Sequence, residues 1–250
     1  MENLGPWLAL GLAFIFLLFL NRWISQHLQG IGLLLTGSQK ASLFLYFILL
    51  FPGILVHELS HWLMAKLLGI RTGRIRLGPA AEGRTNYYSM GSVEVARSDP
   101  LRDSLVGLAP LLIGSALLVL ITYRVFNVSR FAGGLEWDEI LRAFRGWIGK
   151  KDFWLWLYLV FTISNAMMPS AKDREPWGPA IAFILIVVSV GYFTGLISNI
   201  PPSVVRVAKN WAESLAWSLG FTCGVDLAWA LFLGFIERII ELITGRRIIY

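Results

Sequence analysis

The residues best suited to chemistry form a run of five, His57-Glu58-Leu59-Ser60-His61, inside a long apolar stretch. This is an H-E-x-x-H pattern. Residues four apart lie on one face of a helix, so His57 and His61 can each turn a ring nitrogen towards one metal ion. Glu58 is offset by about 100° around the helix axis and can reach a water molecule on that ion. Zinc lowers the pKa of bound water from about 16 to near 7, so a carboxylate can take its proton. The pattern therefore predicts addition of water to an amide bond.

A plainer explanation is that these residues are buried polar groups satisfied by neighbouring helices. The chain holds only three histidines, and two of them stand at this spacing around a glutamate. Apolar residues flank the motif on both sides, at 54–56 and 62–64. An ionisable group at membrane depth costs at least about 2.5–3.5 kcal/mol on insertion scales, so such groups are rarely kept without a role. The metal-binding interpretation is favoured.

A catalytic zinc ion usually takes three protein ligands and leaves one position open. His27, the remaining histidine, stands in a polar stretch after the first apolar run and is expected to be a solvated interfacial residue. The third ligand is then expected to be a carboxylate. Asp173 follows the fourth apolar run, Asp226 lies inside the last one, and Asp152 is a further candidate. The residue types alone leave this choice open.

The composition places these residues in an integral membrane protein that has a lipid bilayer as its surroundings. Of the 250 residues, 56% are hydrophobic and 15% charged, and the mean hydropathy is +0.64. Soluble domains have about 45–50% apolar and about 25% charged residues. The single cysteine, Cys223, excludes a disulfide framework and a cysteine zinc cluster. The net charge of +6 suits anionic headgroups, and no basic patch interleaved with aromatic residues indicates nucleic acid.

The apolar residues come in runs that predict five or six transmembrane helices in a single membrane-embedded domain, 1–250. The runs cover about 5–20, 41–70, 105–125, 153–168, 179–200 and 221–243. Residues 204–219, after Pro201-Pro202, have an amphipathic pattern, and whether they span or lie on the membrane is left open. Residues 136–147 have helical spacing and predict a short interfacial helix.

The connection at 71–100 is polar and predicts a small β-hairpin. Apolar and polar residues alternate at 73–77 and again at 92–97. Gly78-Pro79 and Glu82-Gly83 stand between the two segments and favour turns. The expected fold class is therefore an all-α polytopic membrane protein with one β-hairpin after the second helix.

Together these features resemble the site-2 protease family of intramembrane metalloproteases. That family pairs H-E-x-x-H on one transmembrane helix with an Asn…Pro…Asp motif on a later one. Asn165 and Asp173 keep the eight-residue separation of that motif, which favours Asp173 over Asp226. Pro169 stands one position later than in the family motif, and Arg174 replaces a glycine. The resemblance marks 41–176 as a metalloprotease core, with additional helices at 1–40 and 177–250.

The resemblance implies a zinc metalloendopeptidase that cleaves transmembrane segments of membrane proteins. One Zn²⁺ per chain would be held by His57, His61 and Asp173, with Glu58 as the catalytic base. Asn165 would help to bind the extended substrate. Basic residues balance between the two main loops, so they do not decide the orientation. The resemblance implies that the active site lies near the cytoplasmic face. The oligomeric state is left open.

Two other functions compete with this one. A catalytically inactive homologue would keep the fold as a scaffold that binds transmembrane helices, but such homologues usually lose the glutamate or a histidine. A metal-dependent transporter would spread its polar residues over several helices. Here the motif residues are all present and lie in two segments, so proteolysis is favoured.

Overall fold

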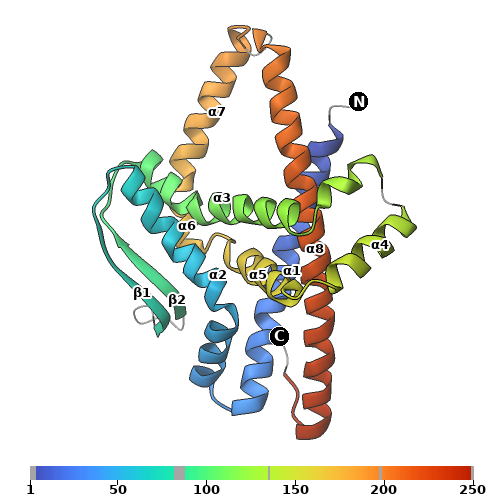
Figure 1. The fold of residues 1–250 in the computed structure, drawn as a ribbon. Helices are drawn as coiled ribbons and strands as arrows, with labels where there is room; N and C mark the ends of the chain where they lie inside the picture. The colour runs from blue at the N-terminus through green and yellow to red at the C-terminus, as the bar shows by residue number, and fades with distance from the viewer. Residues whose placement is uncertain (1–3, 82–87, 135, 197–198, 249–250) are drawn as a thin grey trace.

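The computed structural model describes residues 4–81, 88–134, 136–196 and 199–248. Helices dominate, and one two-stranded sheet lies at the side of the molecule (Figure 1). Within the described ranges, five helices are long and apolar enough to cross a membrane. The predicted all-α polytopic fold with a small hairpin is therefore confirmed.

The two longest helices, α1 (Gly5–Thr36) and α8 (Pro202–Thr244), pack along each other. Both are longer than expected. α1 continues past Leu20 because the following polar stretch still has an apolar face. Ile24 and Leu28, four residues apart, are buried on that face. α8 joins 204–219 and 221–243, which were expected as separate segments, into one helix.

The core of the fold is formed by α2 (Gln39–Leu67), α3 (Pro100–Arg124) and α5 (Phe153–Ala166). Small residues let their backbones approach closely. A Cβ at Gly53 of α2 would lie 1.9 Å from Thr162 O of α5. A Cβ at Gly114 of α3 would lie 2.5 Å from the Cβ of Met167, just after α5. At 14 residues, α5 is about 21 Å long and too short to cross about 30 Å of hydrocarbon on its own.

The predicted hairpin is present as β1 (Thr72–Ala81) and β2 (Tyr88–Val95), which pair antiparallel and lie against α2. Ile75 pairs with Val93 and Leu77 with Gly91. The register shifts twice along β1, between Thr72 and Ile75 and between Leu77 and Ala80. The turn expected at Glu82-Gly83 lies outside the described residues. The hairpin thus leans on the helix that carries the H-E-x-x-H motif.

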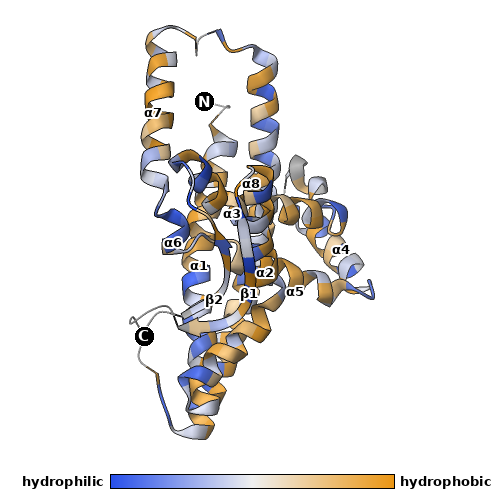
Figure 2. Cartoon of the chain, turned by 90° about the vertical axis from the view of Figure 1, so that its left-hand side faces the viewer, coloured by the Kyte–Doolittle hydropathy of each residue, from blue (hydrophilic) through white to orange (hydrophobic). Residues whose placement is uncertain are grey.

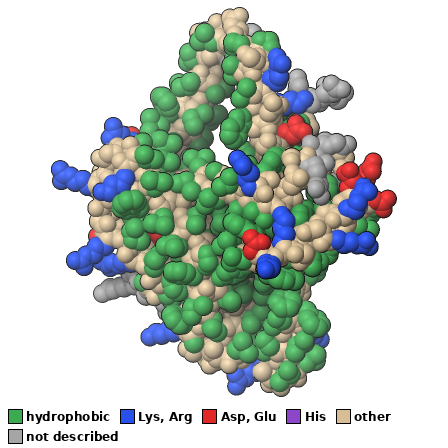
Figure 3. Space-filling view, in the orientation of Figure 1, with side chains coloured by type: hydrophobic (Ala, Val, Ile, Leu, Met, Phe, Trp, Pro, Cys, Tyr) green, Lys and Arg blue, Asp and Glu red, His purple; other side chains and the backbone are tan. Residues whose placement is uncertain are grey.

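The expected short helix after α3 is α4 (Trp137–Ile148), preceded by the 3₁₀ helix η1 (Val128–Gly133). Trp147 connects α4 to the core by a hydrogen bond, in which its Nε1 donates to Phe126 O at 2.9 Å. Trp137 on the outer side is 77% exposed. Figure 3 shows apolar side chains over most of this face of the molecule, with Lys and Arg gathered near the hairpin and along α4.

The last apolar segment begins with the short helix α6 (Ala171–Arg174) and continues as α7 (Trp177–Phe193). α7 contacts α3 near its start, and Ala180 is its one buried residue among those described. Residues 181–190 of α7 are all exposed and mostly hydrophobic, and Figure 2 shows much of this helix in orange. A helix that is apolar all round and unburied suits a lipid environment.

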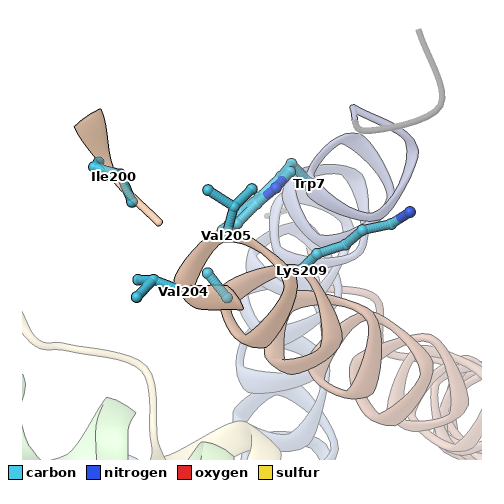
Figure 4. A pocket seen from close by; sticks show the side chains of 6 residues that line it. Trp7, Ile200, Val204, Val205 and Lys209 are labelled. Carbon is cyan, nitrogen blue, oxygen red and sulfur yellow. The ribbon is translucent and has the colours of Figure 1, made fainter. Parts of the chain in front are cut away.

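A small hollow of about 230 Å³ lies between the starts of α1 and α8 (Figure 4). It is lined by Trp7, Ile200, Val204, Val205, Ala208 and Lys209. Apart from Lys209 its lining offers no ionisable side chain, so it holds no set of metal ligands.

Candidate metal centre

Three side chains converge at one point: His57 and His61 of α2 and Asp173 of α6. His61 Nε2 lies 3.1 Å from His57 Nε2 and 3.2 Å from Asp173 Oδ1. His57 Nε2 lies 3.6 Å from Asp173 Oδ2. Two ligands that each lie about 2.0–2.1 Å from one tetrahedral ion are about 3.3 Å apart. These three residues could therefore hold a metal ion.

The ring of His61 is oriented by a carbonyl group that a proline leaves available. His61 Nδ1 lies 2.8 Å from Val106 O, and because a carbonyl only accepts, Nδ1 carries the hydrogen. In a regular helix Val106 O would accept from the N–H four residues later. That position is Pro110, which has no N–H. His61 therefore presents Nε2 with its lone pair to the metal centre.

The ring of His57 is oriented in the same way at the end of α5. His57 Nδ1 donates to Ala166 O at 2.7 Å. Pro169 offers this carbonyl no N–H, and the N–H of Ser170 is taken by Asp173 Oδ2 at 2.7 Å. Ala166 O is thus one of the unpaired carbonyls that every helix end leaves. Hydrogen bonds of this kind fix the tautomer and the direction of a metal-binding histidine.

Both rings and the carboxylate consequently direct lone pairs at one another. With hydrogen on each Nδ1, the two Nε2 atoms of neutral rings meet at 3.1 Å with no hydrogen between them. Lone pairs at this distance are mutually unfavourable unless a positive charge, a proton or a metal ion, lies among the three groups. The donor set, two imidazole nitrogens and a carboxylate, therefore fits a divalent metal ion.

Asp173 reaches the centre through a tight turn. Ser170 Oγ accepts from Asp173 N at 3.2 Å, and Asp173 Oδ2 accepts from Ser170 N, which together form a capping box at the start of α6. Gly107 of α3 lies beneath this turn, where a Cβ would come within 2.2 Å of Asp173 O. Arg174, which replaces the glycine of the family motif, is exposed. The shifted proline and this arginine thus leave Asp173 at the centre.

Glu58 lies beside the two histidines and is only 6% exposed. The hairpin covers it, because a Cβ at Gly91 of β2 would lie 2.6 Å from Glu58 Oε1 and 2.7 Å from Glu58 Cγ. Glycine at position 91 therefore leaves the space that the Glu58 carboxylate occupies.

A cavity of about 1510 Å³ opens over these groups. Residues of α1, α2 and α3, the hairpin and the turn between α5 and α6 form its walls, and His57, Glu58, His61 and Asp173 all line it. Every residue from 89 to 95 of β2 contributes to the wall. β2 pairs with β1 alone, so one edge of this cavity-lining strand has no partner strand within the described sheet.

Asn165 also lines the cavity, but its side chain is already hydrogen-bonded within the protein. Its Nδ2 donates to Phe161 O at 2.8 Å and lies 3.4 Å from Asp226 Oδ1. The role of Asn165 in binding substrate stays a prediction.

The rival carboxylates lie in different surroundings. Asp226 is 1% exposed and lies 2.9 Å from Ser164 Oγ. Asp152 is exposed and accepts from Trp156 Nε1 at 2.7 Å. Neither belongs to the group formed by the two histidines and Asp173.

The prediction that His27 is solvated is wrong. Because α1 continues beyond Leu20, His27 lies inside this helix, half-buried, with its ring stacked on Trp23. It forms an ion pair with Glu237 of α8. His27 is not a member of the metal-binding group.

Sequence reasoning missed the two carbonyl groups that orient the histidines. Val106 and Ala166 act through backbone atoms, so their side chains give no signal. The signal in the sequence is the pair of prolines, Pro110 and Pro169, because each removes an N–H at a helical position or a helix end.

Replacing Pro110 by alanine should strengthen α3 and weaken the metal centre. The new N–H would compete with His61 for Val106 O, so the dissociation constant for Zn²⁺ should rise about 10-fold or more. The thermal unfolding midpoint should rise, because proline in a helix interior costs about 3 kcal/mol. Metal titration and thermal unfolding in detergent measure both quantities. Pro52→Ala is the control, since Pro52 also lies inside a helix, but the carbonyls that accept from His57 and His61 belong to other residues. Unchanged affinity in Pro110→Ala would contradict the role of Val106.

Purified protein should contain about one metal ion per chain, and Asp173→Ala should lose most of it, because two histidines alone bind weakly. Metal analysis of the two proteins measures this. Asp152→Ala removes an exposed aspartate outside the group and should keep the metal. Retention in Asp173→Ala would show that another residue supplies the third ligand.

The chain was also compared with known proteins. It matches no family model, no curated protein and no solved structure. The assignment of the metal centre therefore rests on the geometry and chemistry of the residues described above.

Proposed function

We propose that the chain is an intramembrane zinc metalloprotease that hydrolyses peptide bonds in or near transmembrane segments of membrane proteins. The observation that carries the proposal is the convergence of two histidine Nε2 atoms and one carboxylate beside a buried glutamate. Two histidines and one carboxylate are a known ligand set of catalytic zinc, which keeps a fourth position open. The resemblance to site-2 proteases supports the same activity.

The chemistry follows from the positions of the side chains. A Zn²⁺ ion held by His57, His61 and Asp173 would supply Lewis acidity, which lowers the pKa of water and polarises a carbonyl group. Glu58 accepts the proton of the attacking water on a carboxylate oxygen. It then donates this proton to the leaving amine nitrogen, which regenerates the carboxylate. Glu58 is buried under β2 at Gly91 and still lines the cavity, so it can meet a water molecule that enters there.

The cavity favours an extended substrate. A helical segment hides its amide bonds, so it must unwind before its carbonyl can approach the metal centre. β2 lines the cavity and pairs on one side only, and an extended peptide can pair with a free strand edge by backbone hydrogen bonds. The strand passes directly over Glu58 at Gly91. Substrate paired with β2 would therefore lie beside the catalytic base.

The proposal also states where the cavity lies relative to the membrane. The long apolar helices are compatible with a membrane protein. In agreement with the family resemblance, we place the cavity towards the cytoplasmic face, the side from which water would enter.

Glu58→Gln should abolish cleavage while the metal stays bound, because glutamine keeps the shape of the side chain and cannot accept the proton. Cleavage of a transmembrane reporter in vesicles, with metal analysis of the same sample, measures both. Glu136→Gln, an exposed glutamate before α4, is the matched control and should cleave normally.

Two outcomes would count against this assignment. Wild-type cleavage by Glu58→Gln would remove the base role of Glu58. A metal-loaded wild type that cleaves none of a panel of transmembrane segments but binds them would favour the scaffold function instead.

Gly91→Ala should lower kcat about 10-fold or more with little loss of metal, because displacing a catalytic group by about 1 Å can cost about 100-fold. The added methyl group meets the buried Glu58 carboxylate. In Gly73→Ala the added methyl group meets Glu94, which is exposed and can move. Reporter cleavage and metal content of both variants measure the difference. Equal rates in the two variants would exclude a special role for Gly91.

A further inference from the structure

A cluster of polar side chains, three of them buried and one partly buried, joins three helices at the end of α5. Asn21 of α1, Ser164 and Asn165 of α5 and Asp226 of α8 form this cluster. Ser164 Oγ lies 2.9 Å from both carboxyl oxygens of Asp226, and Asn165 Nδ2 lies 3.4 Å from Asp226 Oδ1. Asn21 Nδ2 donates to Asn165 O at 2.6 Å. The cluster therefore ties α1 and α8 to the same turn of α5.

Keeping a carboxyl group in this place is costly. Asp226 is 1% exposed and stands inside the apolar run of α8. An ionisable residue inside a transmembrane segment generally marks a function. Asp226 is not one of the three metal ligands and does not line the cavity. Asp226 therefore has no direct role in the proposed function.

Two successive carbonyl groups connect the cluster to His57. In a continuing helix Asn165 O would accept from the N–H at position 169, but this residue is Pro169. Asn21 Nδ2 donates to Asn165 O instead, and His57 Nδ1 donates to the next carbonyl, Ala166 O. The two carbonyls belong to adjacent peptide units. Holding the first one therefore restricts the direction of the second.

We propose that Asn21 and Asp226 are positioning residues that hold the end of α5 so that Ala166 O orients the His57 ring. This inference rests on the proposed function only in taking His57 as a metal ligand. Asn21 acts on the backbone of Asn165, and Asp226 acts through Ser164 and the Asn165 side chain. α1 and α8, which lie outside the core 41–176, thereby become parts of the metal centre.

The test compares Asn21→Leu, Asp226→Ala and Asp226→Asn with wild type in detergent, using Co²⁺ as the probe. The visible absorption of Co²⁺ reports the arrangement of its ligands. Asn21→Leu and Asp226→Ala should raise the Co²⁺ dissociation constant about 10-fold and alter the absorption bands, as loss of supporting groups around a metal does. Asp226→Asn keeps an oxygen that can accept from Ser164, so it should recover most of the affinity.

Thr122→Val is the matched control. Thr122 Oγ1 lies 3.0 Å from Ser218 Oγ, and this fully buried pair joins α3 to α8 away from the carbonyls that orient the histidines. Thr122→Val should lower the thermal unfolding midpoint and leave Co²⁺ binding unchanged. If Asn21→Leu and Asp226→Ala behaved like this control, the cluster would be structural only and the proposal would be wrong. Should Asp226→Ala fail to fold, Asn21→Leu decides, because Asn21 is only partly buried.

A second measurement does not need the metal. The chain has three histidines, so ¹⁵N spectra of histidine-labelled apo protein can be assigned residue by residue. Wild type should show hydrogen on His57 Nδ1, and Asn21→Leu should show a mixture of the two tautomers. An unchanged His57 signal would overturn the positioning role. A wild type that binds no Co²⁺ would instead remove the proposed function, and the tautomer of His57 would still decide this inference.

Discussion

The structure depends on one geometric requirement, that two imidazole rings and a carboxylate stay directed at the same point inside a largely apolar protein. Each of these side chains could rotate away unless a further contact fixed its direction. The fold meets the requirement by giving each ring a carbonyl acceptor for its Nδ1 hydrogen. Inside a regular helix each carbonyl accepts from the N–H four residues later, so a side chain finds a free acceptor where that N–H is missing or at a helix end. Pro110 removes such an N–H inside α3, and Pro169 follows the end of α5.

α3 supports several of the groups at this site. Its Val106 carbonyl holds His61, and Gly107 lets the turn that carries Asp173 approach the helix backbone. Ser104 Oγ reaches Pro176 O at 2.6 Å, at the far side of the same turn. Gly114 admits Met167 after α5. A helix that looks in sequence like an ordinary membrane span therefore supports both the His61 ring and the turn that carries Asp173.

Most of the architecture could be predicted from the sequence, because its signals are local. The apolar runs, the alternation at 73–77 and 92–97, and the H-E-x-x-H spacing each need only a few neighbouring residues to be recognised. Asp173 needed the resemblance to a family, since it is separated from the histidines by more than a hundred residues. The lengths of α1 and α8 were missed because their polar stretches are stabilised by packing against each other, which no local pattern records. The network around Asp226 forms where three helices meet, so it could not be predicted from local sequence patterns either.

The length of α8 determines how the chain fits a bilayer. At 43 residues it measures about 65 Å, against about 30 Å of hydrocarbon. Even a tilt of about 40° would leave a vertical extent of about 50 Å. One or both ends of α8 must then project beyond the hydrocarbon, where Arg206 and Lys209 near its start and Arg238 near its end can reach water and headgroups. Since α8 also carries Asp226, which contacts Ser164 of α5, the tilt of α8 in a bilayer is linked to the helix end whose carbonyl orients His57.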